Sequence, residues 1–154
     1  MPTGWRPLDI AEKYPVYKIS DVYHFEKYSP ASSKKLYAWS WIQLIMVLLF
    51  VSYLFGNIAS IGNPKIFIYG AFVFLHVYAY CELMDRHRFS LVWELLKNAF
   101  GLSVIFYHGS WFGAENFTPW INITLISYFI LSPLITAWFV FDDFKKPLPT
   151  QIVH

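Results

Sequence analysis

The segment that decides the fold covers residues 36–55 and reads LYAWSWIQLIMVLLFVSYLF, without a single charged side chain. The hydrocarbon core of a bilayer is about 30 Å thick, and about 20 apolar residues of α-helix are needed to cross it. The segment has that length and that composition. It therefore predicts a transmembrane helix over residues 36–55.

The composition of the whole chain agrees with a membrane protein. Of 154 residues, 56% are hydrophobic and 21% aromatic, while 14% are charged, against about 25% in an average soluble domain. So much apolar surface excludes a disordered chain, and so few charges disfavour a soluble globule. The length fits one domain. The net charge of +2 is small and scattered, so nucleic acid is not an expected partner.

Two further segments have the character of membrane spans. Residues 66–81 (IFIYGAFVFLHVYAYC) carry no charge, and the span extends to residue 84 if Lys65 snorkels toward the membrane surface. Residues 119–141 are also uncharged and contain Pro133, where we expect a kink. Proline is tolerated in a membrane helix when neighbouring groups satisfy the freed carbonyl. We therefore predict spans at about 66–84 and 119–141.

A fourth segment, residues 91–112 (LVWELLKNAFGLSVIFYHGSWF), carries Glu94, Lys97 and His108. It either spans the bilayer with its charged turn at the interface, or lies flat or re-enters. The positive-inside rule helps to decide. Four spans place eleven Lys and Arg residues on one side and Lys65 alone on the other, whereas three spans give nine against three. We therefore predict four spans with both termini in the cytoplasm; the sequence does not distinguish a bacterial inner membrane from the endoplasmic reticulum.

The predicted fold is an all-α polytopic membrane bundle of about four transmembrane helices with an extended N-terminal cytoplasmic arm. The arm covers residues 1–35, the membrane domain 36–141 and a C-terminal tail 142–154. Four prolines in the arm block a long helix; they are Pro2, Pro7, Pro15 and Pro30. The arm either lies extended along another surface, where its aromatic side chains find contacts, or forms a flexible tail.

The sequence contains few of the residue patterns that catalytic or metal sites require. The five histidines include no pair three or four positions apart, so none share a helical face locally; facing His76 and His108 could hold a haem in principle. The single cysteine, Cys81, excludes an intrachain disulfide and a multi-cysteine metal site. No nucleophile-elbow or P-loop pattern occurs. We therefore predict no catalytic residue, no metal ligand and no cofactor in this chain.

One polar constellation follows the second span. Its charged members are Glu82, Asp85, Arg86, Arg88, Glu94 and Lys97. Charges near lipid are costly unless they are paired; Asp85 could pair with Arg88, and Glu94 with Arg86, Arg88 or Lys97. The structural interpretation is that these pairs fasten the turn between the second and third helices. The functional alternative is a contact for a lipid headgroup or a neighbouring domain.

The order of several short motifs resembles a known family. They are PTGWRP at 2–7, a tyrosine-rich stretch ending in YSP at 28–30, a span with Tyr37 and Gln43, and ELMDR at 82–86 followed by WELLK at 93–97. Together they resemble the C-terminal part of alkylglycerol monooxygenase-like proteins of the sterol desaturase / fatty acid hydroxylase superfamily. The resemblance covers nearly the whole chain, and GWRP and the D-R…E-L-L-K block are its most specific parts.

The resemblance implies a role without chemistry of its own. In that family GWRP follows a histidine-box domain that holds two irons and uses a pterin to cleave ether lipids, or to hydroxylate or desaturate other lipids. This chain has none of those boxes. The resemblance thus implies a non-catalytic C-terminal membrane domain, or a separated tail fragment, whose arm packs on a catalytic domain through Trp5 and Arg6.

Two other functions remain open. The chain could be an independent accessory subunit of a larger membrane complex, because an aromatic surface with few charges suits burial against other helices. A small transporter ranks last, because the polar residues of the spans are too sparse to line a continuous water path. The expected partners are accordingly the bilayer and either a histidine-box domain or other membrane subunits.

Overall fold

The computed structural model describes Pro7, Lys13 and residues 32–144, and every regular element within 32–144 is helical. The elements are α2 (Lys34–Gly56), α3 (Ile58–Ile61), α4 (Lys65–Met84), α5 (Ser90–His108), the 3₁₀ helix η1 (Ala114–Asn116), α6 (Ile121–Trp138) and the π-helix η2 (Phe139–Asp143). The all-α prediction is confirmed for this part of the chain. The predicted arm lies outside the described residues apart from Pro7, Lys13 and its last four positions.

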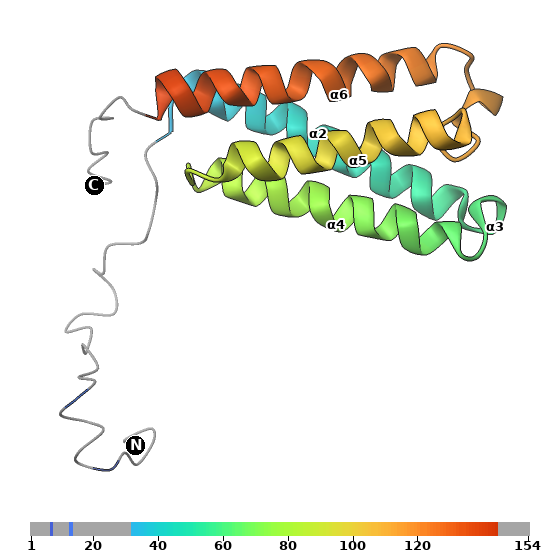
Figure 1. The fold of residues 1–154 in the computed structure, drawn as a ribbon, viewed down its shortest axis with the longest axis horizontal. Helices are drawn as coiled ribbons and strands as arrows, with labels where there is room; N and C mark the ends of the chain where they lie inside the picture. Colours follow the sequence, from blue (N-terminus) through green and yellow to red (C-terminus); the bar gives the residue numbers. More distant parts are fainter. Residues whose placement is uncertain (1–6, 8–12, 14–31, 145–154) are drawn as a thin grey trace.

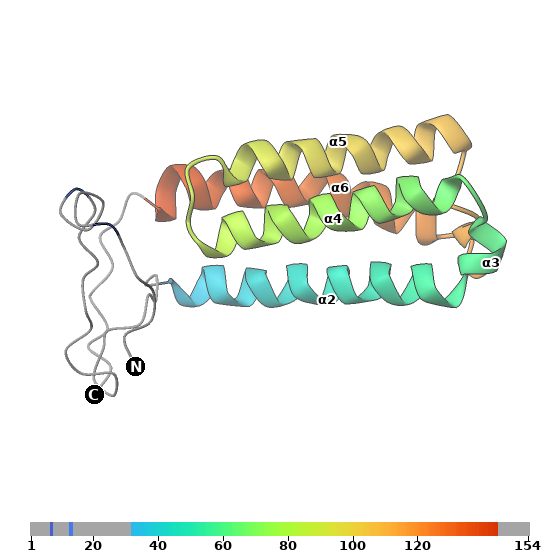
Figure 2. The same ribbon diagram turned by 90° about the horizontal axis from the view of Figure 1, so that it is seen from below.

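The four long helices lie side by side along one common direction (Figures 1 and 2). Contacts join α2 to α4, α4 to α5, and α5 to α6, so helices that follow one another in sequence are antiparallel neighbours, as short connections require. The start of α2 and the end of α6 lie at one end of the bundle, and α3 lies at the other (Figure 1). We call these the terminal end and the α3 end.

The helix boundaries follow from local chemistry. The side chain of Ser33 accepts a hydrogen bond from the N–H of Leu36 at 3.1 Å and caps α2. Helix α5 ends at His108 because Gly109 takes a left-handed φ of 76°, which terminates a helix at little steric cost. The predicted segment 91–112 is therefore helical only as far as residue 108. Helix α6 passes through Pro133 and continues into η2.

Three helices of the described residues are long and apolar enough to cross a membrane: α2, α4, and α6 together with η2 as far as Asp142. Only 28% of each apolar stretch is buried inside the bundle, so most large apolar side chains point outward. Phe67 and Phe74, for example, are 71% and 73% exposed. A soluble monomer rarely exposes apolar surface on this scale, so the structure indicates a membrane protein. Helix α5 does not belong to this set.

The interior is divided along the bundle axis. Toward the α3 end lies an aromatic cluster that includes Phe50, Tyr69, Phe72, Trp111 and Phe129; the Phe72 and Trp111 ring centroids are 4.7 Å apart. Toward the terminal end lies a smaller cluster of Leu36, Trp39, Leu83 and Phe139. Between these two apolar clusters the helices carry polar side chains inward.

Candidate functional site

Polar side chains from all four long helices meet between the two apolar clusters. They are Gln43 from α2, His76 from α4, Glu94, Lys97 and Asn98 from α5, and Tyr128 and Ser132 from α6. We call this set the polar layer. All of its members except the partly buried Tyr128 are buried. Buried polar groups within an apolar bundle are the default place to look for function.

An ion pair forms the centre of the polar layer. The Nζ of Lys97 lies 2.6 Å from Oε1 of Glu94, and the two side chains are 0% and 2% exposed. The side-chain amide of Asn98 donates to the same oxygen at 2.9 Å, and the hydroxyl of Ser132 donates to it as well. With a longer contact from Nε2 of Gln43 at 3.4 Å, four donors converge on one carboxylate oxygen, which compensates a charge that would be costly if it were left alone.

The side-chain amide of Gln43 connects the ion pair to the other helices. Its Nε2 donates to Oγ of Ser132 at 2.8 Å. Its Oε1 accepts from the hydroxyl of Tyr128 at 2.5 Å and from Nζ of Lys97 at 3.3 Å, and it lies 3.2 Å from Nε2 of His76. The last contact requires the proton of a neutral His76 to be on Nε2. Both ends of one amide thus hold α2 against α4, α5 and α6.

Helical spacing explains why these residues meet. Glu94, Lys97 and Asn98 stand at positions i, i+3 and i+4 of α5, and Tyr128 and Ser132 stand at i and i+4 of α6. Residues with these spacings share one face of a helix. Because the outer face of each helix is apolar, the polar face turns inward. Among the described residues, the fully buried side-chain atoms of the layer without a hydrogen-bond partner include Nδ1 of His76 and Oδ1 of Asn98.

The structure divides the predicted charged constellation into two groups. Glu94 and Lys97 lie inside the bundle and face each other, so Glu94 meets a lysine of its own helix rather than an arginine of the turn. Glu82, Asp85, Arg86 and Arg88 remain at the terminal end, where α4 ends and the turn toward α5 begins. The six residues therefore do not form one cluster.

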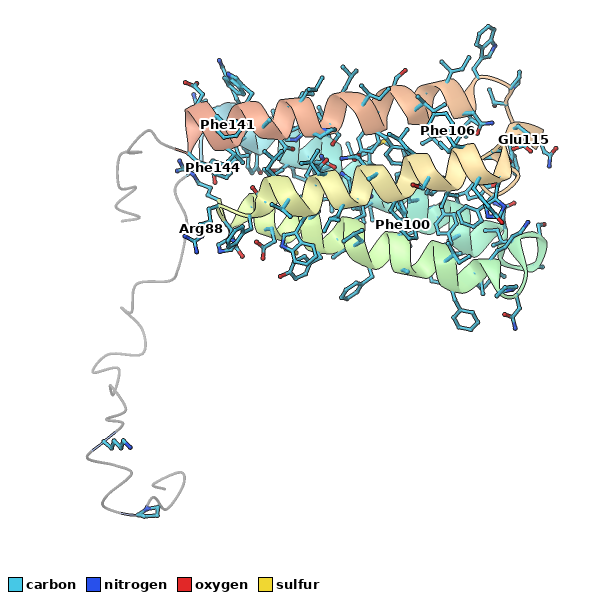
Figure 3. The ribbon with its side chains drawn as sticks, viewed as in Figure 1. Arg88, Phe100, Phe106, Glu115, Phe141 and Phe144 are labelled. Atoms are coloured by element: carbon cyan, nitrogen blue, oxygen red, sulfur yellow. The ribbon has the colours of Figure 1, made fainter. Side chains whose placement is uncertain are left out.

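The four charged residues at the turn make the following contacts. Oε2 of Glu82 lies 2.5 Å from Nδ1 of His87, and Asp85 follows the last residue of α4 with its N–H bonded to the carbonyl of Cys81. The guanidinium of Arg86 lies 5.2 Å from the ring of Phe144, and that of Arg88 lies 4.7 Å from Phe89. Figure 3 shows Arg88 and Phe144 at this end of the bundle.

The other predicted positions are placed as follows. Trp5 and Arg6 lie outside the described residues. His76 belongs to the polar layer, whereas His108 is exposed at the last position of α5, beside Tyr107 and Phe112; the two imidazoles are not brought together. In the part of the chain that the structure describes, no group of three or more His, Cys, Asp or Glu side chains could hold a metal ion.

Sequence reasoning assigned no site role to four members of the polar layer, and it considered His76 only as a possible haem ligand opposite His108. Gln43 and His76 stand alone in their spans, and Asn98, Tyr128 and Ser132 have common polar side chains. The available signal was spacing, because Asn98 follows Glu94 by one helical turn and Ser132 follows Tyr128 by one turn. Gln43 and His76 gave no such signal, since only the packing of α2 and α4 brings them to the same level.

Comparison with known proteins adds no family assignment. No protein-family model matches the chain, and searches of the curated proteins and of the solved structures find no significant match.

Proposed function

We propose that this chain is a non-catalytic membrane domain that supports a lipid-modifying catalytic domain, covalently linked or separate, at the cytoplasmic face. The observation that supports this proposal is the polar layer: its charges are hydrogen-bonded to one another inside a bundle whose outer surface is apolar. A residue that acts on a substrate must be reached by it. Glu94 and Lys97 are at most 2% exposed.

The polar layer is suited to fixing the arrangement of the helices. A buried polar group specifies register, because any other register strands it in an apolar environment. Gln43 satisfies partners on three other helices at once, so a shift of α2 by one turn would break all of these contacts together. Rigid helix positions are what a supporting domain needs beside a catalytic site.

In the proposed topology all four helices cross the bilayer, α5 included, and both termini are cytoplasmic. Helix α5 carries its two charges as a closed pair, which lowers the cost of placing it in lipid. The distribution of Lys and Arg, eleven against one, supports the same orientation. Such a block beside a catalytic domain could line the route by which a lipid leaves the bilayer sideways.

The resemblance to alkylglycerol monooxygenase-like proteins supports a di-iron, pterin-dependent oxidoreductase of the sterol desaturase superfamily as the partner. The metal and the pterin would belong to that partner. A second candidate function is an accessory subunit of another membrane complex. Its support is the aromatic outer surface, with Trp41 on α2 and Trp120 beside α6 51% and 68% exposed, because tryptophan rings are enriched at protein interfaces.

The first test is to read the coding sequence upstream of Met1. The second is to purify the tagged chain from its native membrane in mild detergent and to identify the proteins that co-purify with it. Histidine boxes in frame with the chain, or in a co-purifying protein, are the expected result. Co-purifying subunits without such boxes would favour the accessory subunit. Two irons per chain in the isolated protein, together with oxidation of an ether lipid, would overturn the proposal.

A further inference from the structure

A pocket outside the polar layer opens at the α3 end of the bundle, where α3, the start of α4, the end of α5 and the loop after α5 meet. Its volume is about 170 Å³, several times the roughly 30 Å³ that one water molecule occupies in the liquid. It is lined by Ser60, Ile61, Lys65, His108, Ser110, Phe112 and Gly113. Space of this size can hold a small polyatomic group.

The lining of the pocket has the chemistry of an anion site. Lys65 supplies an ammonium group, His108 an imidazole, and Ser60 and Ser110 supply hydroxyl groups that can donate hydrogen bonds. A lysine ammonium binds phosphate as a point charge. Within residues 32–144 neither Lys65 nor His108 forms an ion pair with an acidic side chain, so the lysine charge is available to a ligand.

The position of the pocket matches the headgroup level of a bilayer. Lys65 is the first residue of α4 and His108 the last of α5, so both stand at helix ends on the α3 side of the bundle. Large aromatic side chains surround this end: Tyr107, Phe117 and Trp120 are 87%, 66% and 68% exposed. Exposed aromatic rings favour the membrane interface.

Lys65 supplies the positive charge of the pocket, and none of the acidic residues that the structure describes lines the pocket. Lys65 is the single Lys or Arg between Lys35 and Arg86, and none occurs between Lys97 and Lys145. The nearest acidic residue in the loop is Glu115, which lies at the same end (Figure 3) but does not line the pocket. An anion in the pocket would therefore meet one lysine and several neutral donors.

We infer that this pocket binds a phosphate group, carried by a phospholipid headgroup or free in solution. The Lys65 ammonium is the charged contact. His108, Ser60 and Ser110 supply hydrogen-bond donors, and Ile61 and Phe112 form the apolar wall. This site is independent of the proposed supporting role, because it lies at the opposite end of the bundle from the turn and the chain termini.

The experiment measures thermal unfolding of the full chain in detergent against phosphatidylglycerol, a diacylglycerol with the same acyl chains, and inorganic phosphate. A ligand that binds only the folded state raises the unfolding midpoint, and the shift grows with ligand concentration relative to Kd. Phosphatidylglycerol is expected to stabilise the protein more than diacylglycerol. If millimolar inorganic phosphate gives the same effect, free phosphate suffices; if only the phospholipid acts, the lipid headgroup is the source.

Variants of the lining residues test whether the stabilisation comes from this pocket. The double variant Lys65→Gln/His108→Asn is expected to weaken apparent binding at least about tenfold, whereas Lys65→Arg keeps the charge and most of the binding. The matched control is Lys34→Gln/His87→Asn, which removes the same residue types from exposed positions at the terminal end and should bind like the wild type. Equal affinity of both double variants, or no preference for phosphatidylglycerol over diacylglycerol, would overturn the inference.

Discussion

The ion pair of Glu94 and Lys97 shows how single residues decide the interior of this bundle. Each charge is buried, and each is neutralised by a partner three positions away on the same helix. Taking two charges out of water is expensive, so the pair adds little net stability by itself. Removing only one of the two partners is strongly destabilising, because the remaining buried charge then has no counterion.

We predict that Lys97→Met lowers the free energy of unfolding by about 3–5 kcal/mol, because it strands the carboxylate of Glu94 in the interior. The double variant Glu94→Gln/Lys97→Met should recover a large part of that loss. The measurement is reversible unfolding in mixed detergent micelles. The control is Glu82→Gln, which breaks the partly exposed pair with His87 and should cost at most about 1 kcal/mol. Equal effects of Lys97→Met and Glu82→Gln would contradict the prediction.

At the scale of the elements, contact between α5 and α6 depends on a glycine. A Cβ atom added to Gly101 would lie 2.6 Å from the Phe129 ring. That ring is fully buried and stacks on Phe50 at a centroid distance of 6.1 Å, so it has little room to move. The absence of a side chain at residue 101 therefore sets how closely the two helices approach.

We predict that Gly101→Ala destabilises the protein by about 1–3 kcal/mol, because overpacking forces side chains or backbone to shift. The matched control is Gly70→Ala on α4, where nothing lies within 4 Å of the added atom; that change should be neutral or slightly stabilising, since alanine favours helix. Unfolding measured for both variants under one condition checks the prediction. Similar losses at both sites would show that close packing at residue 101 is not the cause.

The sequence predicted the positions of the helices better than it predicted which side of each helix faces the interior. The spans at 36–55 and 66–84 agree with α2 and α4 within two residues at each end, because long intervals without charge leave few other places for a span. The end of α5 was missed by four residues, since Gly109 was not recognised as the terminating position. The charged residues were predicted as one cluster because the sequence does not show how α5 is rotated about its axis. That rotation turns Glu94 inward, and it depends on packing of α5 against α4 and α6.

At the scale of the whole molecule, the bundle has an apolar outside and a polar centre, and its proposed topology separates the two loops that flank α5. His87 lies in the connection before α5, and Glu115 in the connection after it. If α5 crosses the bilayer, these residues are on opposite sides. If it does not, they are on the same side.

Single cysteines introduced into a Cys81→Ser background test this topology. We predict that Ser60→Cys and Glu115→Cys react with a membrane-impermeant maleimide from the non-cytoplasmic side, and that His87→Cys reacts only after the membrane is permeabilised. All three positions are exposed on the protein, so accessibility reports the side of the membrane rather than burial. Identical labelling of His87→Cys and Glu115→Cys would refute the crossing of α5.

The placement of both charges of the ion pair on one helix bears on how the protein is made. A lone charged residue at the centre of a helix opposes insertion by about 2.5–3.5 kcal/mol. If α5 crosses the bilayer as proposed, the spacing of three positions between Glu94 and Lys97 allows the nascent segment to insert already neutralised, without waiting for α6. The contacts with Gln43 and Ser132 would then form in a later assembly step, so in the proposed topology insertion of the least apolar segment would not depend on its partners on other helices.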